Sequence, residues 1–279
     1  MTVIDKPAGM TSHDVVNQLR RHFGEKRIGH AGTLDPGATG VLVVAVGNAT
    51  RLMRFLSGAD KTYVGEVVLG SSTTTLDDAG DVTETFDMAG VTAEQARLVV
   101  AEHLTGDIEQ IPPMVSALKV DGRRLHELAR EGIEVERAPR PVHIARFDVD
   151  ATDDPSILRI GVDCSTGTYI RTLADDLGHL LGGAAHLRHL RRSRVGRFTL
   201  DQAQSMDAAT LLPVETAVAH LDAVTVDAAT VELISHGRTL GAWPGDGPWA
   251  VFDESGVLQA VYESFRDGRA KPIVVMVGA

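Results

Sequence analysis

Cysteine is almost absent from this sequence: Cys164 is the only one among 279 residues. This excludes an internal disulfide and any zinc site built from cysteines, and it is typical of a protein of a reducing compartment. The 11 histidines are scattered, and no pair of them lies beside carboxylates at the spacing of a helical metal site. We therefore expect no metal.

Long apolar runs are also missing. The longest, such as VLVVAV at 41–46, are far shorter than the ~20 residues that a membrane-spanning helix needs. The N-terminal MTVIDKPAGM has no apolar core of the kind found in signal peptides. We therefore expect a cytoplasmic protein that does not bind a membrane.

A surplus of positive charge is missing as well, because 27 basic residues face 38 acidic ones and the net charge is −11. Such a balance argues against a nucleic-acid partner. The acid is unevenly distributed, however: residues 61–118 and 201–279 hold most of it, whereas 187–198 contains five arginines and no acid. A run of this kind is either a solvated face or a nucleic-acid contact, and charge alone leaves both open.

The spacing of apolar residues predicts an α+β fold with a central mixed or antiparallel sheet flanked by helices. A chain that is 43% hydrophobic can bury a large core. Strands and helices alternate without a regular βαβ repeat. The expected strands are 2–4, 41–46, 61–70, 142–150 and 157–164, and the expected helices are one capped by Thr11 or Ser12 and ending before Gly24, 92–103, and one from Thr168.

Two segments stand apart from this pattern. Residues 110–141 are flanked by prolines and contain one short predicted helix, around 123–130, so they form an excursion from the main sheet. After about 218 the sequence changes to short strand-like runs joined by acidic glycine turns. We place a domain boundary there, which gives domains 1–218 and 219–279.

The loop GHAGTLDPGATG at 29–40 carries one carboxylate, Asp35, directly before the apolar strand. Asp-Pro-Gly is ordinary turn chemistry, so a structural role is the simplest interpretation. Pro36 also restricts Asp35, which makes the loop stiff at the carboxylate. A preorganised carboxylate can serve as a nucleophile or a general base.

Other candidates have ordinary explanations when they are taken one at a time. His30 can simply pack in the core, Lys6 can be solvated in a turn, and Tyr63 can pack into a sheet face or stack on a base. Arg171 can pair with Asp175 four residues later on the same helix. None of these residues decides the function by itself.

Five segments in this order resemble the bacterial tRNA pseudouridine-55 synthases of the TruB type: DKPAGMTSHDVV at 5–16, GHAGTLDPGATGVLVV at 29–44, DKTY at 60–63, SALKVDGRRLHELAREG at 116–132 and CSTGTYIRTLADDLG at 164–178. The resemblance runs from residue 2 to about 210, and its GxLDPxATG and GTYIRTLxxDLG motifs are very specific. The tail from about 219 resembles, more loosely, the PUA-like RNA-binding domain that members often carry.

The resemblance implies an isomerase that acts on tRNA without a cofactor. Asp35 corresponds to the family's catalytic aspartate, Arg171 to the arginine that pairs with it, and Tyr63 to the tyrosine that stacks on the target base. The reaction breaks the N1–C1′ bond of uridine 55 in the T loop, turns the uracil and rejoins it through C5. Whether the aspartate attacks C1′, adds to the base or removes a sugar proton stays open.

The resemblance also implies contacts with the T arm of the tRNA. His30 corresponds to the loop histidine that fills the space of the flipped nucleotide, and Lys6 belongs to a motif that supports the active-site loop. The excursion corresponds to an RNA-gripping insertion, which makes Lys119, Arg123 and Arg124 candidate phosphate contacts. Members often have LYELA where this chain has LHELA, which leaves the role of His126 open. We expect a monomer.

Two other functional classes remain as alternatives. A tRNA-binding or tRNA-folding chaperone would need no catalysis, but it would have no reason to keep Asp35, Tyr63 and Arg171 together. A glycosidase-like hydrolase would need two carboxylates beside the scissile bond, and no motif of the sequence places a second one.

Overall fold

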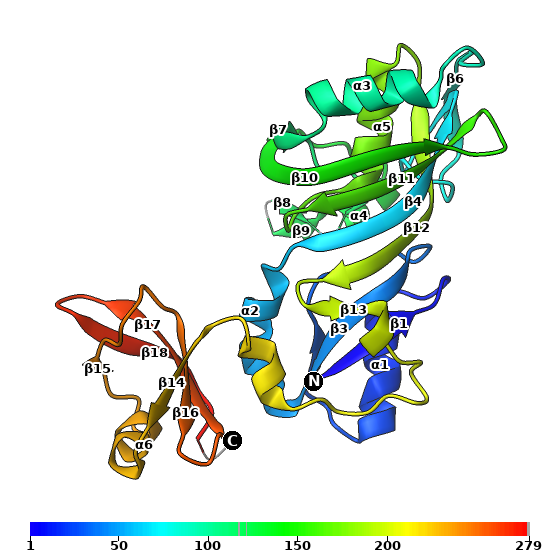
Figure 1. Cartoon of the computed structure of the whole chain (residues 1–279). Helices are drawn as coiled ribbons and strands as arrows, with labels where there is room; N and C mark the ends of the chain where they lie inside the picture. Colours follow the sequence, from blue (N-terminus) through cyan, green and yellow to red (C-terminus); the bar gives the residue numbers. More distant parts are fainter. Residues whose placement is uncertain (117, 121, 278–279) are drawn as a thin grey trace.

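The computed structural model describes residues 1–116, 118–120 and 122–277. One large sheet dominates the N-terminal three quarters of the chain (Figure 1). Its strands, from edge to edge, are β1 (Thr2–Lys6), β3 (Thr39–Val46), β12 (Ala185–Val195), β4 (Lys61–Leu69), β11 (Ile157–Cys164), β10 (Arg140–Ala151) and β7 (Gly106–Gln110), with β2 (Ile28–His30) beside β3 and β13 (Phe198–Thr199) beside β12.

The sheet is mixed, which is one of the two arrangements that the sequence left open. Strands β3 and β12 run parallel, and the other neighbours along the sheet are antiparallel. At the parallel contact Gly40 lies opposite Arg192. Gly40 has φ +101°, and a Cβ there would lie 2.2 Å from the Arg192 carbonyl oxygen. Only glycine allows this approach, so the glycine at the second position of β3 lets β12 lie this close.

Helices cover the sheet: α1 (Ser12–Phe23), α3 (Ala93–His103) and α5 (Ile170–Leu180), with the shorter α2 (Met53–Ser57) and the 3₁₀ turns η1 (Gly47–Leu52), η2 (Leu200–Gln202) and η3 (Val214–Val218). Thr11 is the N-cap of α1, and it forms a capping box with Asp14. Thr92 and Gln95 form a capping box at the start of α3, which lies within the helix predicted over 92–103. The helix predicted from Thr168 begins two residues later, at Ile170.

Two small hairpins project from the sheet. Strands β5 (Ser71–Thr73) and β6 (Val82–Thr85) form one, and β8 (Lys119–Val120) and β9 (Arg123–Arg124) form the other. The helix predicted around 123–130 is α4 (Leu125–Arg130). It starts later than predicted because residues 123 and 124 are used in the hairpin.

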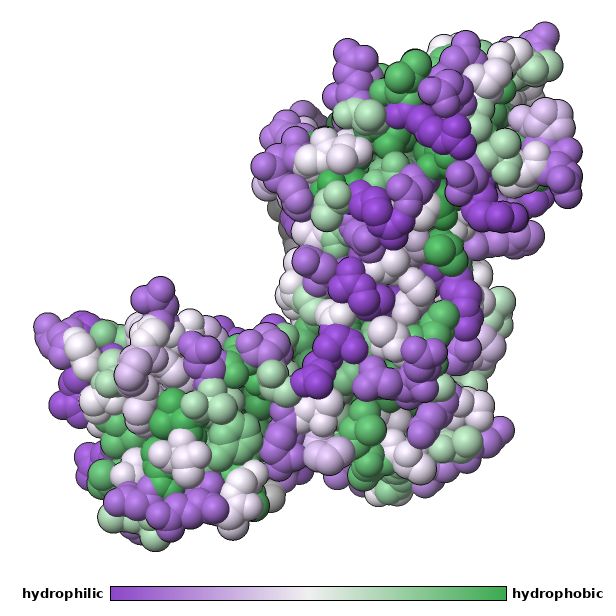
Figure 2. Space-filling model, in the orientation of Figure 1, coloured by the Kyte–Doolittle hydropathy of each residue, from purple (hydrophilic) through white to green (hydrophobic). Residues whose placement is uncertain are grey.

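A second sheet forms a separate lobe at the C-terminal end of the chain (Figure 1). It contains β14 (Asp222–Val226), β16 (Trp249–Asp253), β17 (Leu258–Phe265), β18 (Arg269–Val275) and β15 (Leu240–Gly241), in this order, with α6 (Ala228–Ser235). Figure 2 shows the two lobes meeting at an angle, with hydrophilic and hydrophobic residues interspersed over the face in view. One apolar cluster joins the lobes, because Ala250, Leu258 and Val261 pack with Leu52 and Leu56.

Candidate active site

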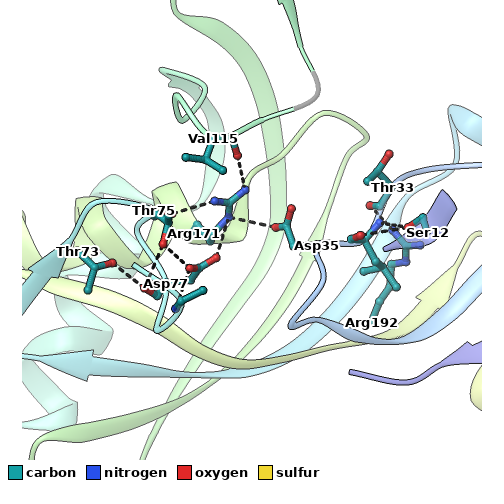
Figure 3. A network of polar contacts seen from close by, with 11 residues as sticks. Ser12, Thr33, Asp35, Thr73, Thr75, Asp77, Val115, Arg171 and Arg192 are labelled. Carbon is teal, nitrogen blue, oxygen red and sulfur yellow. Dashed lines mark hydrogen bonds and ion pairs between the residues drawn. The ribbon is translucent and has the colours of Figure 1, made fainter. Parts of the chain in front are cut away.

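The loop before β3 is held by hydrogen bonds to its backbone (Figure 3). Arg192, which is fully buried, donates to the carbonyls of Gly32 (3.0 Å) and Thr33 (3.3 Å). The buried Ser12 hydroxyl accepts from the Leu34 amide at 2.9 Å and lies 3.1 Å from the Leu34 carbonyl. A loop rich in glycine is therefore fixed by side chains from β12 and α1.

The turn that carries Asp35 is fixed in the same way. The Ala38 amide donates to the Asp35 carbonyl at 3.1 Å, which closes the Asp-Pro-Gly turn predicted from the sequence. The Pro36 carbonyl accepts from the Gly9 amide (2.9 Å) and from the Lys6 ammonium (3.2 Å). Lys6 is fully buried, and burial lowers its pKa to about 8. The Lys6 ammonium thus holds the turn through its hydrogen bond to the Pro36 carbonyl.

Asp35 pairs with Arg171, which projects from the first turn of α5 (Figure 3). The Arg171 Nε lies 3.1 Å from the Asp35 carboxylate and 3.6 Å from that of Asp77. The two Nη atoms donate to the carbonyls of Thr75 (2.8 Å) and Val115 (2.9 Å). Four groups from three separate segments therefore orient one buried guanidinium toward Asp35.

Arg171 does not pair with Asp175, the alternative that the sequence offered, but with Asp35 and Asp77. Asp175 instead lies 3.4 Å from the Ser72 hydroxyl and 3.6 Å from His179. Arg171 has only 5% of its side chain exposed, so it points into the protein and not along the helix surface.

The electrostatic environment of Asp35 pulls its pKa in both directions. Burial raises the pKa of this carboxyl above its ordinary value, the Arg171 guanidinium opposes the rise, the Asp77 carboxylate adds to it, and Lys6 opposes it. The 42% of the Asp35 side chain that remains accessible lines two adjoining hollows. The carboxylate is thus held by one cation and is open toward a ligand-sized space.

The first hollow has a volume of about 240 Å³. Tyr63 forms part of its wall from β4 and is 7% exposed. Burial raises the pKa of the Tyr63 phenol, and the Arg192 guanidinium opposes this rise. The wall also includes Asp35, Lys61, Ser116, Arg171, Leu190, Arg192 and the turn at 166–170. The three predicted residues Asp35, Tyr63 and Arg171 therefore share one pocket.

Two family models match the chain. One, described as "TruB family pseudouridylate synthase (N terminal domain)", covers residues 20–170, and the other, described as "tRNA pseudouridylate synthase B C-terminal domain", covers residues 171–224. The chain belongs to the TruB family of pseudouridylate synthases.

Relatives of this TruB family member agree with the assignment. A protein named tRNA pseudouridine synthase B from Mycobacterium sp. (strain KMS) is 47% identical, over 99% of this chain and 95% of the relative. One with the same name from Mycobacterium leprae (strain TN) is 44% identical, over 99% and 90%. Among solved structures, a chain of a Cbf5–Nop10–Gar1 complex matches with a TM-score of 0.72 at 27% identity, covering 99% of this chain and 84% of that one.

His30 lies outside the residues that line the pocket of this TruB chain. It is the last residue of β2 and lies opposite Val44. Burial lowers the pKa of its imidazole, and its Nδ1 is buried without a hydrogen-bond partner in the part of the chain that the structure describes. It directly precedes the loop between β2 and β3, which carries Asp35.

Residues 115 and 116, near the start of the excursion, contribute to the site of this TruB chain. Val115 binds Arg171, and Ser116 lines the pocket. Arg123 and Arg124 lie away from that wall, and both are exposed. Arg123 forms an ion pair with Glu131, and the Arg124 amide lies 3.4 Å from the Glu127 carboxylate. The side chains of Lys119 and His126 lie outside the described ones.

The arginine run 187–198 is more than a solvated face. Four of its five arginines lie on β12. Arg192 is buried, and the other three pair with carboxylates on other strands of the sheet: Arg188 with Glu66, Arg191 with Asp5 and Arg194 with Asp163. The net charge of this surface is therefore lower than the sequence suggests.

Sequence reasoning missed three residues that hold the Asp35 loop or contact Arg171. Arg192 was one of five arginines within residues 187–198, Ser12 was a candidate for the cap of α1, and Asp77 lay in the acidic run TLDDAGD. Asp77 is held by Thr75 and by the Ala79 amide at 3.2 Å. No local pattern distinguishes these residues from their neighbours, because each acquires its role from a segment distant in sequence.

No described helix has both the length and the apolar content required to span a bilayer.

Proposed function

We propose that this chain converts uridine 55 in the T loop of tRNA to pseudouridine, with Asp35 as the catalytic residue. The observation that carries the proposal is the Asp35–Arg171 pair, with 3.1 Å between Oδ2 and Nε, in a pocket that Tyr63 walls. The names of the relatives, tRNA pseudouridine synthase B, support tRNA as the substrate. The reaction needs no oxidant or reductant, because uridine and pseudouridine are isomers.

The pocket suits the chemistry of such an isomerisation. A volume of about 240 Å³ admits one extruded nucleoside rather than a base pair, so the target must leave its stack at a cost of a few kcal/mol. Tyr63 supplies a rigid aromatic face for the uracil. Arg171 favours the ionised form of Asp35, which then meets the sugar where positive charge develops at C1′.

The fixed loop explains how hydrolysis is avoided. The base is detached for part of the reaction, and water that reaches C1′ in that interval would release it. Held carbonyls at Gly32, Thr33 and Pro36 keep the loop in one geometry around the sugar. Asp77 lines the neighbouring hollow but not the pocket itself, so a pair of carboxylates that flank the bond, as a hydrolase needs, is not what this geometry offers.

The decisive experiment uses unmodified tRNA transcript and maps pseudouridine after incubation with the protein. We expect product at position 55 from the wild type and none from Asp35→Asn, while Asp207→Asn, which changes an exposed carboxylate on the same lobe, keeps full activity. Because Asn is close in size to Asp, tRNA binding should persist in Asp35→Asn. No product from the wild type, or turnover by Asp35→Asn, would falsify the proposal.

We further propose that the excursion grips the T arm through Lys119, Arg123 and Arg124, and that 219–279 is a PUA-like RNA-binding domain of a monomeric cytoplasmic enzyme. Arg123 and Arg124 are exposed, and Arg123 can exchange its ion pair with Glu131 for phosphate. Neutralising both with Gln should lower the slope of log Kd against log salt by about 2, with Arg21→Gln on α1 as the control. An unchanged slope would refute the phosphate contacts.

A further inference from the structure

Lys61 is a third cation in the wall of the pocket, in addition to Arg171 and Arg192. It is the first residue of β4 and lies two positions before Tyr63, so both side chains point to the same face of the sheet. Both line the pocket, with exposures of 6% and 7%. The stem of Lys61 lies against Gly32 of the catalytic loop, where a Cβ would be 3.4 Å from the lysine Cε.

The ammonium of Lys61 has no carboxylate partner among the described residues. It donates to the Ala59 carbonyl at 2.7 Å, and two of its three N–H bonds remain. Burial lowers the pKa of Lys61 to about 8, Arg192 on β12 adds to this effect, and Cys164 on β11 and Asp60 oppose it. A buried lysine without a counter-charge is costly, which indicates that a ligand supplies the negative charge.

The other two cations of the pocket are already occupied. The charge of Arg171 faces two carboxylates, and Arg192 is directed toward the carbonyls of Val41, Gly32 and Thr33. Arg192 has no carboxylate partner among the described residues either, but each of its three nitrogens donates to a carbonyl. Lys61 has a single carbonyl partner among those residues, so it is the cation of this wall with N–H bonds left for a ligand.

The proposed reaction creates an anion in this pocket. When the N1–C1′ bond breaks, its electron pair stays on N1, and the negative charge spreads over N1 and the two carbonyl oxygens of the uracil. The sugar carries the opposite charge until C1′ is joined to C5. At that step the C5 proton is lost and N1 gains a proton, so the overall change is an isomerisation.

We infer that the Lys61 ammonium donates a hydrogen bond to a carbonyl oxygen of the detached uracil and so stabilises the leaving group. The inference rests on the proposed function and adds to it the residue that holds the free base. Lys61 then acts on the leaving group while Asp35 acts on the sugar, and Tyr63 supports the ring between cleavage and rejoining.

Single-turnover rates with enzyme in excess test this. The tRNA is labelled with tritium at C5 of uridine, and release of tritium reports product. Removing one donor to a developing anion slows comparable enzymes about 10²- to 10³-fold. We expect this loss in Lys61→Met, a smaller loss in Lys61→Gln, and a rate within about tenfold of wild type in Lys61→Arg, with Kd for tRNA unchanged in all three. Lys26→Met, at an exposed site, should match the wild type.

The second-order rate constant gives an independent readout. It should fall for the wild type above about pH 8, because the free enzyme then loses the ammonium proton, and the fall should move to higher pH in Lys61→Arg. Rates of Lys61→Met within threefold of wild type, weaker tRNA binding, or the same pH profile in Lys61→Arg would overturn the inference. If Lys61→Met does not fold, the single-turnover rates of Lys61→Gln and Lys61→Arg test the inference in its place. A wild type without product defeats the proposed function instead.

Discussion

Replacing Arg192 by Met should make the loop that carries Asp35 less rigid, whereas the same change at Arg191 should leave the loop unchanged. The two arginines are adjacent on β12 and point to opposite sides of the sheet. Arg192 is fully buried and donates to the Val41 carbonyl at 2.8 Å as well as to two loop carbonyls. Arg191 pairs with Asp5 at 2.8 Å, and both of these side chains are more than one third exposed.

The expected magnitudes follow from these partners. Without the guanidinium, the buried Val41 carbonyl loses its side-chain donor. The carbonyls of Gly32 and Thr33 lose a donor too, but water can partly replace it there. Leaving one buried polar group unsatisfied costs about 1–3 kcal/mol, so the sum for Arg192→Met is about 3 kcal/mol. The partly exposed pair of Arg191 contributes about 0.2–1 kcal/mol.

Urea unfolding of the wild type and both variants measures the difference, and hydrogen exchange of amides 32–38 reports the loop directly. We expect faster exchange in this segment for Arg192→Met alone, with a slower single-turnover rate. Equal destabilisation by the two variants, or a loop that stays protected in Arg192→Met, would refute the reasoning that one buried arginine holds the loop.

Three further outcomes are expected. Gly40→Ala should lower Tm strongly, because its Cβ would lie 2.2 Å from the Arg192 carbonyl oxygen, whereas Gly37→Ala meets nothing within 4 Å and should be tolerated. The stability of the wild type relative to Lys6→Met should rise by at most about 3 kcal/mol between pH 7 and pH 10.5, because folding lowers the Lys6 pKa from 10.5 to about 8 and the unfolded chain binds the extra proton in that window; a constant difference in urea unfolding across this range would contradict it. The single-turnover rate should fall on the acid side at a pH above the ordinary carboxyl value of 3.8, because burial raises the pKa of Asp35, which must be ionised; an acid limb below that value would contradict it.

Much of the fold follows from local sequence patterns. The apolar, β-branched run 41–46 predicts a strand buried on both faces, and β3 is one. Gly24 was correctly predicted to follow the end of α1, and α3 lies within the range predicted for it, 92–103. The largest error is the central strand β12, which its arginine-rich sequence did not indicate. The predicted helix around 123–130 also began too early, because residues 123 and 124 join a hairpin.

The site was predictable only in part. Asp35, Tyr63 and Arg171 were identified through motifs that resemble a family, and the structure brings them to one pocket. Arg192 and Asp77 could not be found in this way, because a buried arginine in a strand and an acid in a turn look like their neighbours until the sheet is assembled. Their roles depend on register and on segments that meet only in three dimensions.

The hydrogen bonds from Arg192 to the loop that carries Asp35 also determine when this loop can become ordered during synthesis. The Gly32 carbonyl and the Arg192 guanidinium that holds it are 160 residues apart in the chain. At roughly 5–20 residues per second, a ribosome needs about 8–32 s to make that interval. The loop that carries Asp35 is thus among the first segments to emerge, and it is completed only after β12 has followed. A nascent chain would carry the Asp35 carboxylate for this whole period without a formed pocket, because the pocket is complete only when β12 has joined the sheet.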